Sequence, residues 1–219
     1  MVGLDEHGVD AAYAGTQKCL SCPPGLAPVS FSERALERAL DAGRGPSPSW
    51  YLDLALIGRY WGNERAYHHT APTNMVVALH EALRLCLVEG LGARFQRHRQ
   101  AGAALQAGLE AMGLDLLVEP GIRLSQLTAV AAPSGIDEAA VRRRLLTRHG
   151  IEIGGGLGAL KGKAWRIGLM GSGATRQNVM LCLGALGESL SEEGHPPEGD
   201  GLQAAASVWD ELAGKPEDL

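Results

Sequence analysis

The sequence has 219 residues, with 20 lysines and arginines against 25 aspartates and glutamates, so its formal net charge is −5 and it lacks the basic excess of a nucleic-acid-binding protein. Hydrophobic residues make up 45% and charged residues 21% of the chain, which excludes a disordered protein. It has four cysteines, no signal-peptide pattern at its start and no apolar run near the roughly 18 residues of a membrane span, so we expect a cytoplasmic protein without a membrane or nucleic-acid partner.

The first ninety residues are predicted to be part of an α/β domain. Two short apolar runs predict strands and three stretches predict helices: strands over 9–14 and 27–31, and helices over 32–40, 51–61 and 72–89. A domain boundary is predicted near Gly90. Because two strands need a wider sheet beside them, we expect the chain to be a fragment of a larger protein.

Residues 91–190 have the pattern of a separate, small α+β domain. Helices and strands alternate there: helices over 93–112, 137–149 and 175–190, and strands over 114–118, 127–132, 151–153 and 164–170. This order is typical of an antiparallel sheet with helices on one face. Residues 191–219 begin with a stretch rich in Pro, Gly and acidic residues, and we expect this tail to be disordered.

Lys18 is the first candidate for catalysis. It lies in the segment GTQKCLSCPPG, directly after a predicted strand, between a flexible glycine and a rigid Pro-Pro-Gly sequence. A lysine held at the carboxyl end of a strand is well placed to form a Schiff base, and burial there would lower its pKa and leave a neutral amine. The alternative is an ordinary solvated charge.

Two groups of residues resemble metal sites without fitting one. Cys19 and Cys22 form a C-x-x-C pair, but the chain offers no second pair of ligands at zinc spacing. A redox site would lie at a helix N-terminus, whereas Pro-Pro-Gly follows Cys22 here. His68 and His69 are adjacent, and we expect their side chains to diverge. No metal site is therefore predicted.

Tyr67 and Thr70 precede the helix predicted over 72–89. Thr70 could act as the N-cap of that helix. Alternatively, the two hydroxyls could hold a phosphate at the helix N-terminus, because backbone N–H groups and the helix dipole favour an anion there.

Arg166 stands in an otherwise apolar predicted strand, Ala164 to Met170. A guanidinium in such a run needs a partner, which is either a carboxylate of the protein or the carboxylate of a substrate gripped in a bidentate manner. Composition alone leaves both open. The glycine-rich stretch over 154–163 does not match a phosphate loop or a dinucleotide fingerprint, and we expect it to connect two strands.

Seven segments, in order, resemble the alanine–glyoxylate and serine–pyruvate aminotransferases, a branch of the class V, fold type I pyridoxal-phosphate enzymes. They are GTQKCLSCPPGLAPVSFS, YLDL, YHHTAPTN, EGLGARFQRHRQ, HGIEIGGGLG, KAWRIGLMG and ATRQNV. The resemblance implies that residues 1–90 are the C-terminal part of the cofactor-binding large domain and that residues 91–190 are the small C-terminal domain.

The resemblance also implies roles for five residues and a cofactor, pyridoxal 5′-phosphate. Lys18 matches the Schiff-base lysine, Gln17 a neighbour that contacts the cofactor, and Arg166 the residue that binds the substrate carboxylate. Tyr67 and Thr70 match a pair that binds the cofactor phosphate of the other subunit, which implies a homodimer. The implied reaction transfers an amino group from alanine or serine to a 2-oxo acid such as glyoxylate or pyruvate.

Members of this family carry an N-terminal half, including the aspartate that pairs with the pyridinium nitrogen, and we expect the present chain to be without it. The resemblance therefore implies an incomplete enzyme. The alternatives are an inactive fragment or interaction module, or another class V activity such as cysteine desulfuration.

Overall fold

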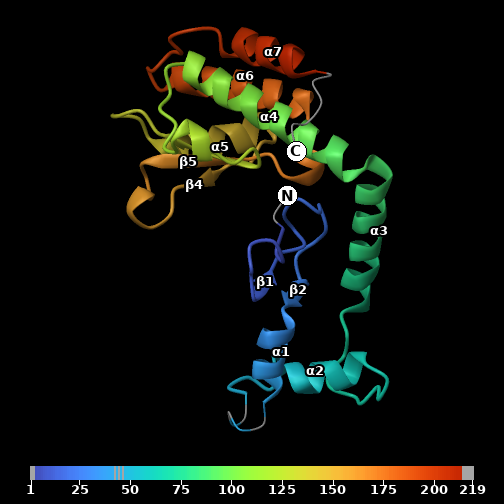
Figure 1. Ribbon diagram of the computed structural model, residues 1–219. Coiled ribbons are helices and arrows are strands. Elements are labelled where there is room, and N and C mark those ends of the chain that lie inside the picture. Colours follow the sequence, from blue (N-terminus) through green and yellow to red (C-terminus); the bar gives the residue numbers. More distant parts are fainter. Residues whose placement is uncertain (1–2, 42, 44, 46, 214–219) are drawn as a thin grey trace. The chain divides into compact units, whose positions relative to one another are not determined.

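The computed structural model describes residues 3–41, 43, 45 and 47–213 (Figure 1). The chain divides into two compact units, Met1–Gln17 with Cys22–Ala82, and Lys18–Ser21 with Leu83–Leu219. The division lies inside helix α3, before the boundary that we predicted at Gly90, because the last turns of this continuous helix belong with the second unit.

The first unit contains a hairpin and three helices. Its elements are β1 (Ala11–Tyr13), β2 (Val29–Phe31), α1 (Glu33–Leu40), α2 (Leu54–Trp61) and the greater part of α3 (Thr73–Glu89). The helix predicted over 32–40 is confirmed as α1, and Ser32 caps it, since its hydroxyl accepts from the Ala35 amide at 3.1 Å. Helix α2 begins later than predicted because the Asp53 carboxylate caps it, accepting from Ala55 and Leu56.

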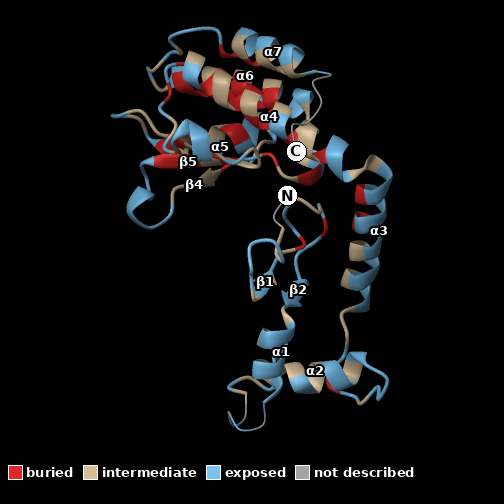
Figure 2. Ribbon diagram, in the orientation of Figure 1, coloured by how far each residue is buried: buried red, intermediate tan, exposed pale blue. Residues whose placement is uncertain are grey.

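The two strands pair in antiparallel register and are largely exposed, although both come from apolar runs of the sequence. Figure 2 shows both strands mostly in the colour of exposed residues. Tyr13 is 85% and Val29 56% exposed. In the described part of the chain this sheet has only two strands, and no further strand covers the apolar side chains of Tyr13 and Val29.

The second unit has a three-stranded antiparallel sheet in the order β3 (Leu127–Ala131), β5 (Ala164–Gly168), β4 (Gly154–Gly155). The predicted strand over 114–118 is reduced to an isolated bridge between Leu116 and Val130, and the strand predicted over 151–153 lies at β4 instead. The glycine-rich stretch over 154–163 connects two strands, as predicted: β4 lies at its start and β5 follows it. A 3-10 turn, η3 (Gly158–Leu160), lies between them.

Helices cover one side of this sheet, as predicted (Figure 1). They are α4 (Leu91–Ala111), α5 (Glu138–His149) and α6 (Arg176–Glu192), and α7 (Gly201–Leu212) packs on α4 and α6. Short 3-10 turns lie at η2 (Pro120–Ile122) and η4 (Gly171–Gly173). Trp165 is fully buried beneath the helices and its indole N–H donates to the Glu138 carbonyl at 3.1 Å. None of the described helices combines the length and hydropathy that a bilayer crossing requires.

Helix α7 corrects the prediction of a disordered tail for residues 191–219. Asp200 caps it by accepting from the Gln203 amide, and Ala205 is fully buried in the core. The helix packs closely on α4, because Gly108 and Gly201 bring the two backbones together: a Cβ on Gly108 would lie 2.8 Å from the Gly201 carbonyl oxygen. Residues 214–219 lie outside the described part of the chain.

Gly108→Ala is expected to destabilise the second unit. Its Cβ would also lie 2.4 Å from Leu183 Cδ1, and overpacking of this kind costs about 1–3 kcal/mol. Gly184→Ala is the matched control, since that helical glycine has open space around it; there the substitution should stabilise by about 0.5–1 kcal/mol. The measurement is the free energy of unfolding in urea, and equal effects of the two substitutions would contradict the close approach of α7.

Candidate active site

The Lys18 turn, residues 16–22, closes around a buried threonine. The Thr16 hydroxyl donates to the Pro23 carbonyl at 3.0 Å, and the side chain is fully buried. The Ser21 amide donates to the Lys18 carbonyl at 3.0 Å, with Ser21 in the left-handed region at φ 58°. These bonds constrain the backbone on both sides of the lysine.

The side chains of Gln17 and Lys18 are both exposed. Gln17 folds back over Gly15, where a Cβ would lie 2.6 Å from Gln17 Oε1. The burial that we expected for Lys18 is therefore not found. Its amine is open to a ligand.

Four side chains where α3 meets α4 form the α4 cluster: Glu89, Arg94, Arg97 and His98. Arg94 Nη1 lies 2.5 Å from Glu89 Oε2, and Arg97 Nε lies 2.6 Å from Oε1 of the same carboxylate. Hydrogen bonds from Arg97 and then Arg94 lower the pKa of Glu89, against an opposing effect of burial. Glu89 is thus a stable counter-ion for two partly buried guanidiniums.

The α4 cluster binds the Lys18 turn and the η4 loop. Arg94 Nη2 donates to the Cys19 carbonyl at 2.6 Å. Arg97 Nη1 donates to the carbonyls of Gly171 and Ala174 at 2.8 and 2.9 Å. Two arginines one helical turn apart therefore hold two segments that lie far apart in the sequence.

His98 is held as a neutral imidazole with its proton on Nδ1. This atom lies 2.7 Å from the Arg94 carbonyl, which can only accept, whereas Nε2 accepts from the Gly171 amide at 2.9 Å. Burial is the main cause that lowers the pKa of His98, and the charges of Arg97 and Arg94 lower it further. The bond to the Arg94 carbonyl and the charge of Glu89 oppose them.

Tyr67 and Thr70 lie together ahead of α3. Their hydroxyl oxygens are 3.3 Å apart, and both side chains are exposed. Thr70 is not the N-cap, because the Pro72 carbonyl accepts the first helical bond, from the Val76 amide at 3.1 Å. The pair is free to meet a ligand in front of the helix.

We predicted that the rings of His68 and His69 diverge, and this is wrong. Their Nδ1 atoms are 2.8 Å apart, and His68 Nε2 bonds the Trp50 carbonyl at 3.0 Å. Three imidazole nitrogens are thus engaged within the protein. Across the residues that the structure describes, no three His, Cys, Asp or Glu side chains gather in a way that could hold a metal ion.

Arg166 is half-buried on the sheet face opposite the core, because its neighbours Trp165 and Ile167 point into the core and side chains alternate along a strand. Its Nε donates to the Gly155 carbonyl at 2.8 Å. It forms no ion pair with a carboxylate among the described residues. The guanidinium lies over Gly154, where a Cβ would be 3.0 Å from its terminal nitrogen.

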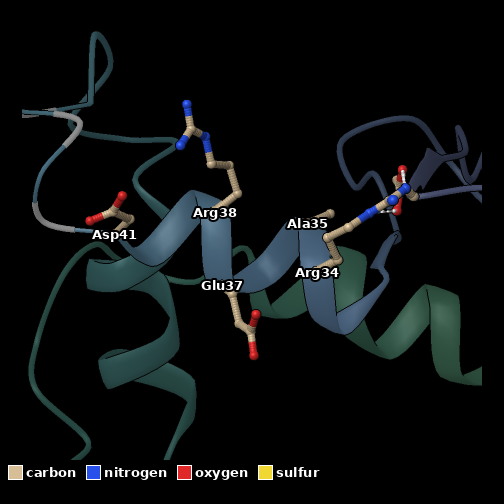
Figure 3. Close-up of a pocket in the computed structure, with 6 residues that line it drawn as sticks. Arg34, Ala35, Glu37, Arg38 and Asp41 are labelled. Atoms are coloured by element: carbon tan, nitrogen blue, oxygen red, sulfur yellow. Dashed lines mark hydrogen bonds and ion pairs between the residues drawn. The ribbon is translucent and has the colours of Figure 1, made fainter.

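A separate surface hollow lies along α1 and does not belong to this set (Figure 3). It is lined by Asp10, Arg34, Ala35, Glu37, Arg38 and Asp41. Figure 3 labels five of them, and the Arg34 guanidinium forms an exposed ion pair with the sixth, Asp10. None of the predicted site residues lines this hollow.

The structure thus brings Tyr67 next to Thr70 in the first unit and places Lys18 and Arg166 in the second. Sequence reasoning missed the α4 cluster. The available signal was the spacing of Arg94, Arg97 and His98, which puts the three side chains on one face of a helix that starts beside the acidic Glu89.

The curated relatives of this chain are aminotransferases. It is 42% identical over 227 residues to a (S)-ureidoglycine–glyoxylate transaminase of Bacillus subtilis, covering 95% of this chain and 55% of the relative. It is 44% identical over 191 residues to an alanine–glyoxylate aminotransferase of Callithrix jacchus, covering 85% and 46%. The chain therefore spans about half the length of the curated relatives it matches. No protein-family model matches it.

Solved structures agree with this similarity. The chain superposes on a pyridoxamine–pyruvate aminotransferase from Mesorhizobium loti with a TM-score of 0.91 and 32% identity, over 97% of this chain and 55% of the other. The predicted fold, a portion of a fold type I aminotransferase with a small α+β domain, is confirmed.

The neutral state of His98 predicts a pH dependence of stability. Its pKa is lowered by folding, so its contribution is complete above the unfolded value, near 6.5, and is lost as the pH falls below it, by at most about 1.4 kcal/mol per pH unit. The free energy of unfolding, measured between pH 7.5 and 5, should fall less in His98→Gln than in wild type. His80→Gln, an exposed control, should keep the wild-type slope; parallel slopes in all three proteins would contradict the assignment.

Proposed function

We propose that this chain, a homologue of class V aminotransferases of the alanine–glyoxylate and ureidoglycine–glyoxylate type, carries part of the active site of a pyridoxal-phosphate-dependent transaminase. The donor set fits this cofactor: an accessible primary amine, a pair of adjacent hydroxyls before a helix, and a guanidinium without a carboxylate partner among the described residues. When bound, pyridoxal phosphate supplies an aldehyde that condenses with amines and a ring that accepts electrons from the substrate.

The role proposed for Lys18 is to bind the cofactor covalently and then to move a proton. Its amine is exposed on a turn whose backbone is bonded on both sides, so the nitrogen is accessible while its main chain is fixed. With the cofactor bound, the Lys18 amine would be the base that takes the proton from the substrate α-carbon and the acid that passes it to the carbon of the cofactor. Gln17, directly beside it, is proposed to contact the cofactor.

Arg166 provides the observation that carries the proposal. A half-buried guanidinium is costly to keep unpaired, yet its one described hydrogen bond goes to a backbone carbonyl. Its remaining N–H groups form the planar fork that matches a carboxylate. This supports the substrate-carboxylate alternative over a structural ion pair, since no protein carboxylate among the described residues meets Arg166.

Tyr67 and Thr70 are proposed to bind the cofactor phosphate. Two hydroxyls 3.3 Å apart can both donate to one phosphate, and the amides at the start of α3 add to the positive potential there. By analogy with the family, this phosphate would belong to the other subunit of a homodimer.

The proposed substrates are a small amino acid, alanine or serine, and a 2-oxo acid, glyoxylate or pyruvate. The names of the relatives support glyoxylate as acceptor. An interaction module without chemistry is the alternative, and the exposed apolar residues of the first unit favour it, among them Tyr13, Val29, Trp50 and Trp61. Covalent attachment of a pyridoxyl group to Lys18 distinguishes a transaminase from such a module.

Borohydride reduction in the presence of pyridoxal phosphate should attach one pyridoxyl group to wild-type protein. The attachment should vanish in Lys18→Ala, because the proposal places the reactive amine there. Intact mass reports the stoichiometry, and peptide mapping reports the position. Lys161→Ala, which removes another exposed lysine of the second unit, should label like wild type. Equal labelling of wild type and Lys18→Ala would rule out a cofactor lysine at this position.

Arg166→Gln should weaken binding of alanine about 10- to 100-fold, the effect of losing about 1.5–3 kcal/mol of hydrogen bonding to a charged group. Arg166→Lys should recover only part of this, because an ammonium lacks the fork. The dissociation constants are measured by calorimetry with pyridoxal phosphate present. Arg142→Gln is the control, since Arg142 flanks the adjacent Gly155 but is paired with Glu138; equal losses in both variants would contradict the role of Arg166.

A further inference from the structure

The segment that follows Lys18 belongs to the second unit and is attached to it by three kinds of contact. Arg94 donates to the Cys19 carbonyl at 2.6 Å. The Ser21 hydroxyl accepts from the Ser172 amide at 2.7 Å. Gly171 packs against Cys19 and Ser21: a Cβ at this glycine would lie 1.8 Å from Ser21 Oγ and 3.1 Å from the Cys19 carbonyl oxygen.

The same η4 loop follows Arg166 in the chain. β5 ends at Gly168 and the loop begins at Gly171, which adopts φ 58°. His98 accepts from the Gly171 amide, so the α4 cluster binds this loop directly. A backbone of only a few residues therefore joins the candidate carboxylate-binding residue to the contacts of the Lys18 turn.

The bonds of the α4 cluster leave little freedom at this junction. Arg94 has 11% of its side chain exposed, and the Glu89 carboxylate that neutralises it is bound by Arg97 as well. Charge-assisted hydrogen bonds in such a partly desolvated place are stronger than neutral ones. Removing the Arg94 guanidinium would free the Cys19 carbonyl, while Arg97 would still be paired with Glu89.

We propose that Arg94 is a positioning residue that, through the Cys19 carbonyl, holds the Lys18 turn in contact with the η4 loop and thereby fixes the distance between the Lys18 amine and the Arg166 guanidinium. This inference rests on the proposed function for its meaning, since an amine and a carboxylate-binding group must flank the α-carbon of one amino acid. A fixed separation favours substrates whose two contacts match it and excludes misaligned ones.

The test compares Arg94→Gln with Arg123→Gln by amide hydrogen exchange of the full chain. Arg123 is a matched control, because it is 15% exposed and likewise bonds one carbonyl, of Val118, and one carboxylate, of Glu110. In Arg94→Gln, exchange of the Ser21, Gly171 and Ser172 amides should accelerate about tenfold through local opening. Arg123→Gln should leave these amides unchanged.

A milder variant guards against general unfolding. Arg94→Lys keeps the charge beside Glu89 but cannot reach two acceptors with a rigid fork, so its exchange rates should lie between those of wild type and Arg94→Gln. Unchanged exchange at Ser21 and Ser172 in Arg94→Gln overturns the proposal. So does acceleration of equal size over the whole second unit.

Labelling kinetics then connect the restraint to Lys18. In Arg94→Gln the rate of borohydride-trapped pyridoxyl attachment at Lys18 should change severalfold relative to Arg123→Gln. An unchanged rate together with unchanged exchange refutes the positioning role alone. Absence of attachment in the wild type refutes the proposed function, whereas the exchange data still decide whether Arg94 restrains the turn.

Discussion

The carboxylate of Glu89 is the group on which the arrangement of the candidate site depends. It accepts from both Arg94 and Arg97, and this allows two guanidiniums to be partly buried next to backbone carbonyls that they bind. Without the carboxylate, two like charges one helical turn apart would repel each other in a place poorly reached by water. The Lys18 turn and the η4 loop would then lose a common point of attachment.

Arg166 differs from the arginines of the α4 cluster in a way that has a chemical meaning. Arg94 and Arg97 are neutralised within the protein, so their positive charges stabilise the fold. The guanidinium of Arg166 lies on the opposite face of the sheet from the core and has no carboxylate among the described residues. Arg94 and Arg97, which are paired with Glu89, hold segments of the backbone in place. The guanidinium of Arg166, which has no such partner, is available to a ligand.

Local signals predicted the elements well. Ser32 and Asp137 cap the predicted helices, and Gly150 ends α5 in the left-handed conformation, because capping depends on neighbours in the sequence. Helix α7 was missed because the Pro, Gly and acidic residues at the start of the tail are not typical of all of residues 191–219: residues 201–212 contain helix-forming Ala, Leu, Gln and Glu. The α4 cluster was missed for a different reason: Arg94 and Cys19 are 75 residues apart, and their contact is tertiary.

The most direct measurement is a crystal structure of the chain after treatment with pyridoxal phosphate and borohydride. We expect continuous density from Lys18 Nζ to a pyridoxyl group, with Arg94 bonded to the Cys19 carbonyl and Arg166 free of protein carboxylates. A pyridoxyl group on another lysine, or a Lys18 turn detached from α4, would contradict the proposed site.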